Sequence, residues 1–185
     1  MTDDLRRQRS TADLRADKPS RHDFLAQPRR PITLVITGLK MENLGSLFRT
    51  ADAAQVERVV LCGVPYRPDS LSFRQASKGS HRWVPHSVAP SALEVVRQLK
   101  DEGHYIVALE QAVDSLPYHR AEYRFPCVLV VGREREGVSE ELLGLADLTV
   151  ELPMAGMTNS LNVAVATGIL VYRMIEYMEE SRAPR

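Results

Sequence analysis

The segment 42-ENLGSLFRTADA-53 places an amide, a glycine and a guanidinium at a spacing that could serve chemistry. Asn43 and Gly45 lie where an aliphatic run gives way to a helical pattern, and Arg49 follows in the next turns. An Arg in that position can direct five N–H donors at a phosphate or a carboxylate. The plainer interpretation is that Asn43 caps the helix and that Arg49 is a surface cation. The segment alone leaves both interpretations open.

A second segment, 131-VGREREGVSEELL-143, joins an aliphatic run to a short helical pattern that begins at Ser139. Gly132 and Gly137 permit positive φ angles and a close approach of the backbone, so that N–H and C=O groups could grip a ligand. Glu134 lies between them. A tight connection between a strand and a helix could look the same. The segment lacks the GxGxxG spacing and the GK[ST] ending of the common nucleotide-binding loops.

The third segment is 150-VELPMAGMTNSLNVAVATGILVYRM-174, in which a strand-like run stops at Pro153 and a long apolar helix begins near Ser160. Ligands of α/β sheets bind outside the carboxyl ends of the strands, where helix N-termini present free N–H groups. Ser160 and Asn162 would place a hydroxyl and an amide there. A helix cap followed by a polar helix face is the alternative.

These segments need a scaffold, and the rest of the sequence predicts one. Continuous apolar runs indicate strands at 32–37, 59–62, 104–109, 127–131 and 148–152, and helical patterns occupy 43–55, 91–102, 140–145 and 160–180. Residues 65–82 are polar, basic and rich in turn formers, which indicates a loop. Strands that alternate with helices and lack polar alternation predict a single α/β domain with a parallel sheet covered on both faces.

Composition limits the classes of protein to consider. A chain of 185 residues with 44% hydrophobic residues fits one domain, and a net charge of zero means that any nucleic-acid surface must be local. Cys62 and Cys127 lie in aliphatic runs, as buried reduced thiols do, and the five histidines lack ligand spacing, so we expect no metal site. Without a signal peptide or a membrane span, we expect a cytoplasmic protein.

We divide the chain into a basic, flexible arm at 1–30, a folded domain at 31–180 and a tail at 181–185. The arm holds eight Arg or Lys residues against five Asp. A solvated tail is the plainer interpretation, and a basic arm that contacts nucleic-acid phosphates is the sharper one.

Taken in order, the three segments resemble the three signature motifs of the SpoU/TrmH-type RNA methyltransferases of the SPOUT superfamily. The motifs read Asn-x-Gly-x-x-x-Arg-x-Ala, Gly-x-Glu-x-x-Gly-x-Ser, and Pro-Met followed by Ser-Leu-Asn-Val, and the resemblance covers roughly residues 31–178. It implies an α/β fold with a deep C-terminal trefoil knot, S-adenosylmethionine as the methyl donor, and a ribose 2'-hydroxyl of RNA as the acceptor.

The resemblance also assigns roles to residues. The catalytic pocket would contain Asn43, Arg49, Glu134, Ser160 and Asn162, with Glu134 orienting Arg49 through a charge-assisted pair. The cofactor would contact Leu109, Glu110, Gly132, Leu152, Met154, Ser160 and Leu161. The family proposal makes the Arg the base. Because a guanidinium has a pKa above about 12, Arg49 could instead hold a phosphate and stabilise the developing alkoxide.

Three expectations concern partners. No sizeable RNA-recognition domain is appended, which favours tRNA over rRNA. In 65–82, the side chains of Arg74, Lys78 and Arg82 could contact RNA, although a solvated loop is the plainer interpretation. Apolar residues surround much of the closing helix, and a helix on a sheet needs only a stripe about 100° wide. Burial inside a knot could cover the additional apolar surface of this helix. The resemblance instead favours a homodimer whose RNA site spans both chains.

Two other classes of function remain open from the sequence. The chain could be an inactive knotted RNA-binding protein, although all five catalytic positions carry the expected residues. It could also be a nucleotide-binding α/β regulator, although the usual nucleotide loops are missing.

Overall fold

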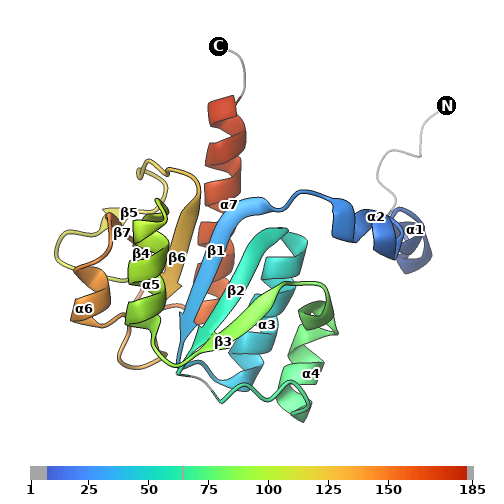
Figure 1. Cartoon of the computed structure of the whole chain (residues 1–185), viewed down its shortest axis with the longest axis horizontal. Coiled ribbons are helices and arrows are strands. Elements are labelled where there is room, and N and C mark those ends of the chain that lie inside the picture. Colours follow the sequence, from blue (N-terminus) through green and yellow to red (C-terminus); the bar gives the residue numbers. More distant parts are fainter. Residues whose placement is uncertain (1–7, 64, 183–185) are drawn as a thin grey trace.

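The chain folds around a single parallel sheet (Figure 1), as a computed structural model that describes residues 8–63 and 65–182 shows. The seven strands follow the order β3-β2-β1-β6-β4-β7-β5, and every strand pair is parallel. Their bounds are β1 Arg30–Thr37, β2 Val56–Cys62, β3 His86–Ala89, β4 Tyr105–Leu109, β5 Leu116–Pro117, β6 Cys127–Val131 and β7 Leu148–Glu151. The predicted α/β class with a mostly parallel sheet is therefore confirmed.

Helices cover both faces of the sheet. They are α3 Met41–Ala53, α4 Leu71–Ser77, η1 Ser80–Arg82, α5 Ala92–Asp101, α6 Glu140–Leu143 and α7 Val163–Arg182. Alternate side chains of β1 enter different cores: Leu34 and Ile36 pack with α3 and α7, whereas Val35 packs with α5 and α6. Burial on both faces explains why the central strands read as unbroken apolar runs. Cys62 and Cys127 are free and buried, as expected.

Residues 65–82 form a loop in the sequence-based prediction, and that prediction is wrong. The segment contains α4 and η1, because Phe73 is fully buried against Phe48 of α3 and Ser77 is also buried. A short apolar face within a polar segment gives a weak periodic signal, and packing against α3 supplies what the sequence lacks. The short edge strands β3 and β5 also escaped prediction.

The arm carries two short helices, α1 Thr11–Ala16 and α2 Arg21–Ala26, neither of which buries a residue. It contacts the domain through Phe24, whose ring packs edge-on against Trp83 at 5.9 Å between centroids. Arg6 and Arg7 lie outside the described residues, as do 183–185 of the tail. The helix α7 continues to Arg182, so 181 and 182 extend a helix that was predicted to end at 180.

Candidate active site

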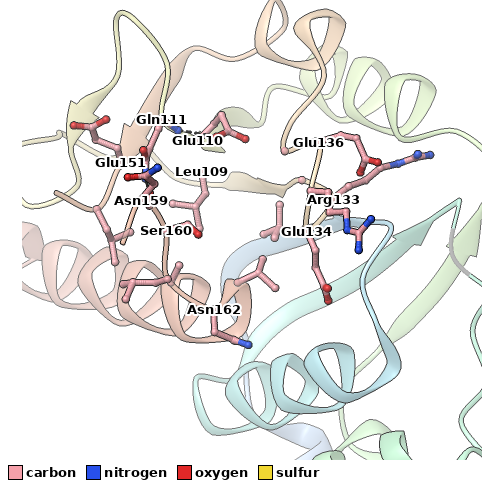
Figure 2. A pocket seen from close by; sticks show the side chains of 18 of the residues that line it. Leu109, Glu110, Gln111, Arg133, Glu134, Glu136, Glu151, Asn159, Ser160 and Asn162 are labelled. Carbon is pink, nitrogen blue, oxygen red and sulfur yellow. Dashed lines mark hydrogen bonds between the residues drawn. The ribbon is translucent and has the colours of Figure 1, made fainter. Parts of the chain in front are cut away.

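A cavity of about 730 Å³ opens where β4, β6 and β7 end (Figure 2). We call it the strand-end cavity. Its wall comes from the loops that follow these three strands and from the start of α3. Ten of the eleven residues that the sequence assigns to catalysis or cofactor binding line it: Asn43, Leu109, Glu110, Gly132, Glu134, Leu152, Met154, Ser160, Leu161 and Asn162. The three motif segments therefore meet at one place in the fold.

A chain of hydrogen bonds joins the three motif segments at one side of this cavity. Asn162 donates from Nδ2 to Oδ1 of Asn43 at 2.9 Å, and Asn43 donates from Nδ2 to Oε1 of Glu134 at 2.7 Å. The same Glu134 oxygen accepts the backbone N–H of Lys40 at 3.0 Å. Figure 2 shows Glu134 and Asn162 reaching toward α3 from different segments. The side chains of Asn162, Asn43 and Glu134 thus each have a defined hydrogen-bond partner, which fixes their orientation.

Glu134 is held as a carboxylate by its neighbours. Partial burial by itself would raise the pKa of Glu134, but the hydrogen bonds from Lys40 and Asn43 and the charge of Lys40 lower it below its ordinary value overall. The Lys40 ammonium lies 3.3 Å from the second carboxylate oxygen. Glu134 is therefore an acceptor near neutral pH and has no proton to give. Lys40 is a site residue that sequence reasoning missed, and a Lys three residues before Asn43 was its only signal.

Asn162 has two roles that the sequence presented as alternatives. Its Oδ1 accepts the backbone N–H groups of Ala164 and Val165, at 2.9 and 3.3 Å, and so caps the N-terminus of α7. Its Nδ2 remains free to donate to Asn43. The cap explains why α7 begins at Val163, although the helical pattern predicts a start near Ser160. Ser160 consequently lies in the loop, where its hydroxyl faces the cavity (Figure 2).

The second motif forms a tight turn that requires its glycines. Arg133 and Gly137 exchange two backbone hydrogen bonds of 2.9 and 3.0 Å, and Glu134 lies inside the turn that they close. A Cβ on Gly132 would overlap the backbone of Gly137 and Val138. Gly137 itself has a φ of 68°, which side chains disfavour. The glycines therefore let the turn fold back on the end of β6 and bring Glu134 to α3.

The predicted pair between Glu134 and Arg49 is not formed within a single chain, so a pair between the two chains of a dimer stays a prediction. Glu134 pairs with Lys40, and within the described ranges no carboxylate pairs with Arg49. Arg49 lies farther along α3, exposed, in a separate depression that we call the Arg49 hollow. This hollow is lined by Ser46, Arg49, Thr50, Asp52, Ala53, Ser77, Lys78, Ser80, Trp83 and Tyr172. The first motif thus spans two sites: Asn43 belongs to the cavity and Arg49 to the hollow.

The cations predicted to contact RNA lie away from the strand-end cavity. All three side chains are exposed: Arg74 lies on α4, Lys78 caps the C-terminus of α4 and Arg82 ends η1. Of the three, Lys78 lines the Arg49 hollow. Lys78 therefore adds positive charge beside Arg49, and none of the three side chains lines the cavity that holds Glu134 and Ser160.

In residues 8–63 and 65–182, no group of three or more His, Cys, Asp and Glu side chains is placed to hold a metal ion. In the same residues, no helix is long and apolar enough to cross a membrane.

Comparison with known proteins gives one consistent result. Residues 31–172 match the model of the SpoU rRNA Methylase family. The tRNA (guanosine(18)-2'-O)-methyltransferase of Thermus thermophilus is 34% identical over 155 residues, which cover 81% of this chain and 77% of the relative. The crystal structure of a TrmH/SpoU tRNA-modifying enzyme from A. aeolicus superposes with a TM-score of 0.77 at 31% identity, covering 85% of this chain and 81% of that one. A structure of an AdoMet-bound rRNA methyltransferase from Sinorhizobium meliloti gives a TM-score of 0.74 at 29% identity, covering 84% and 60%.

Proposed function

Because the chain belongs to the SpoU methylase family, we propose that it transfers a methyl group from S-adenosylmethionine to a ribose 2'-hydroxyl of RNA. The observation that carries this proposal is the convergence of three separated motifs on one cavity, with Asn43, Glu134 and Asn162 joined by hydrogen bonds. The names of the relatives favour tRNA as the RNA class. An RNA substrate and two free buried thiols fit the cytoplasm, where thiols stay reduced.

The strand-end cavity suits the proposed cofactor in size and chemistry. Its volume of about 730 Å³ lies in the range of small-ligand pockets, roughly 300–1,000 Å³. Its wall combines apolar side chains (Leu109, Leu152, Leu161) with the bare backbone at Gly132, where a Cβ would find no room. When bound, S-adenosylmethionine supplies a methyl group on a positively charged sulfur. The chain contributes the walls that hold it and exclude water.

The chain must also prepare the ribose hydroxyl, which is a poor nucleophile near neutral pH. Positioning the hydroxyl in line with the methyl group supplies much of the acceleration. A donor that stabilises the oxygen as it loses its proton supplies more. We assign this second task to Arg49, because a guanidinium keeps its proton and can hold a phosphate and the developing negative charge together.

A homodimer accounts for the separation of Arg49 from the strand-end cavity. The exposed side chains Val165, Ile169 and Tyr172 form one face of α7, which we call the α7 stripe. This stripe lines a groove with Ser46 and Thr50, which also line the Arg49 hollow. A partner chain that covers the stripe would therefore border the hollow, and its own strand-end cavity could meet Arg49 there. Isologous packing would create two equivalent sites.

The C-terminal trefoil knot also belongs to the proposal. It rests on membership of the SpoU methylase family, because the resemblance of the three motif segments to that family implies such a knot.

We test the proposed activity by transfer of labelled methyl groups from S-adenosylmethionine to total tRNA and rRNA, followed by nucleoside analysis. The expected product is a 2'-O-methylated nucleoside, with more label in tRNA. A variant with Glu94→Ala, on the exposed face of α5, serves as the control that retains activity. Label on a base instead of a ribose, or RNA binding without any transfer, would contradict the proposal.

We further propose that RNA contacts the cations around the Arg49 hollow and the arm. Lys78 lines the hollow, and Arg74 and Arg82 lie on the helices α4 and η1 to either side of it in the sequence. The arm adds charge nearby: burial raises the pKa of Asp52 in the hollow, and Lys18 and Arg29 are close enough to oppose that rise. Such a cluster would bind phosphates without regard to sequence.

Replacing Lys78 and Arg82 together by Ala should weaken binding to all RNAs and lower the slope of log K against log salt by roughly 1 to 2, about one unit per phosphate contact. Filter binding or fluorescence anisotropy over a salt series measures the slope. Arg97→Ala is the matched control, because Arg97 is exposed on α5, whose core lies on the other face of the sheet. An unchanged slope in the double variant would show that these two cations are bystanders.

A further inference from the structure

The residues that follow β4 can contact two separate loops of the strand-end cavity, because of where β4 lies in the sheet. β4 lies between β6 and β7, so the chain leaves β4 between the two loops that carry Glu134 and Ser160. The first two residues after β4 are Glu110 and Gln111. Both line the strand-end cavity, and both side chains are committed to hydrogen bonds with neighbouring backbone (Figure 2).

Glu110 grips the loop after β6. Its Oε2 accepts the backbone N–H of Val138 at 2.8 Å, and its Oε1 accepts that of Gln111 at 2.9 Å. The carboxylate lies directly against Gly137, where a Cβ would overlap it. Gly137 and Val138 form the base of the turn that contains Glu134. Both carboxylate oxygens are thus engaged by backbone donors, so Glu110 fixes the turn that presents Glu134.

Gln111 grips the loop after β7. Its Nε2 donates to the backbone carbonyl of Asn159 at 2.7 Å. Asn159 directly precedes Ser160, and Asn162 follows two residues later at the cap of α7. The side chain itself is exposed, so packing does not explain its orientation. The carboxamide therefore ties the Ser160 loop to the end of β4.

We infer that Glu110 and Gln111 form a positioning clamp, in which one dipeptide sets the spacing between the Glu134 turn and the Ser160 loop. Glu110 then acts through Gly137 and Val138 instead of serving as a direct cofactor ligand. The effect on activity rests on the proposed function, whereas the effect on the two loops does not. A small misplacement of reacting groups is costly, on the order of 100-fold in rate per ångström, so the clamp should matter for turnover.

Hydrogen exchange of the free protein tests the clamp without any substrate. In Glu110→Ala the amides of 132–138 should exchange faster, and in Gln111→Ala those of 152–160 should, while exchange in β1 and α5 stays as in the wild type. Gln98→Ala, which removes an exposed carboxamide from α5, is the control. Unchanged exchange at both loops would overturn the inference.

Turnover separates positioning from direct cofactor binding. We expect both Ala variants to lower kcat by about 10- to 100-fold. Gln111→Lys, which can still donate to the Asn159 carbonyl, should recover part of the loss, whereas Gln111→Glu should not, because a carboxylate cannot donate. If Glu110→Ala raised only the Kd for S-adenosylmethionine and left kcat and loop exchange unchanged, Glu110 would be a ligand and the inference would fail. A wild-type protein that transfers no methyl group would contradict the proposed function, and the exchange data would still decide the clamp.

Discussion

Arg49→Lys is expected to lower turnover by at least about 100-fold while S-adenosylmethionine binds almost as well as to the wild type. Loss of one donor that stabilises a developing oxyanion typically costs about 100- to 1,000-fold in kcat. Lys keeps the charge but lacks the planar fork that can hold a phosphate and a second oxygen at once. Single-turnover methyl transfer measures the first quantity, and isothermal titration measures the second.

We expect the variant to lose turnover and to keep S-adenosylmethionine binding because of where Arg49 lies. Arg49 lines the Arg49 hollow and is absent from the wall of the strand-end cavity, so its loss should leave the walls of the proposed cofactor site intact. No carboxylate in the part of the chain that the structure describes holds its guanidinium. Its donors are therefore available to an RNA phosphate.

The control for this variant is Arg97→Lys, which makes the same chemical change at an exposed position on α5. It should retain the activity of the wild type. Turnover near that of the wild type in Arg49→Lys, or a matching loss of S-adenosylmethionine affinity, would contradict the role that we assign to Arg49.

Sequence patterns predict those helices and strands whose own residues are enough to specify them. The central strands β1, β4 and β6 carry continuous apolar runs because they are buried on both faces, and such runs are typical of a parallel sheet. Elements that depend on a neighbour were missed. The helix α4 needs Phe48 of α3 to bury Phe73, and the two residues of β5 acquire their pairing only from β7.

The residues of the candidate site also fall into two groups: those that the sequence predicts and those that depend on contacts between distant segments. The three motif segments brought eight of the predicted residues to one cavity, since each segment follows a strand of the same parallel sheet. Spacing could not place Arg49, because Asn43 and Arg49 lie six residues apart on a helix and so face different directions. Lys40 and the engagement of Glu110 with Val138 depend on contacts between loops that no motif encodes.

Val165→Asp is the second change for which we expect a large effect. The α7 stripe leaves Val165 52% exposed in the isolated chain. If a partner chain covers it, a carboxylate there would be buried without a partner, which disfavours association strongly. Light scattering at micromolar concentration should give twice the 20.8 kDa chain mass for the wild type and the single-chain mass for the variant.

Val88→Asp is the matched control, because Val88 is 57% exposed on β3, at the edge of the sheet. It should remain dimeric and active. A dimeric Val165→Asp protein would place the interface elsewhere, and a single-chain protein with full activity would show that the site does not need a partner.

Mixing two inactive variants decides whether the site spans both chains. Arg49→Ala removes the hollow's guanidinium, and Asn162→Ala removes the amide that links α7 to Asn43 in the strand-end cavity. If Arg49 of one chain serves the cavity of the other, a mixed dimer contains one site with both defects and one intact site. Random reassociation makes about half of the dimers mixed, so activity should return to about a quarter of the wild-type value. If Arg49 serves the cavity of its own chain, every site carries one defect, and the mixture should stay as inactive as its components.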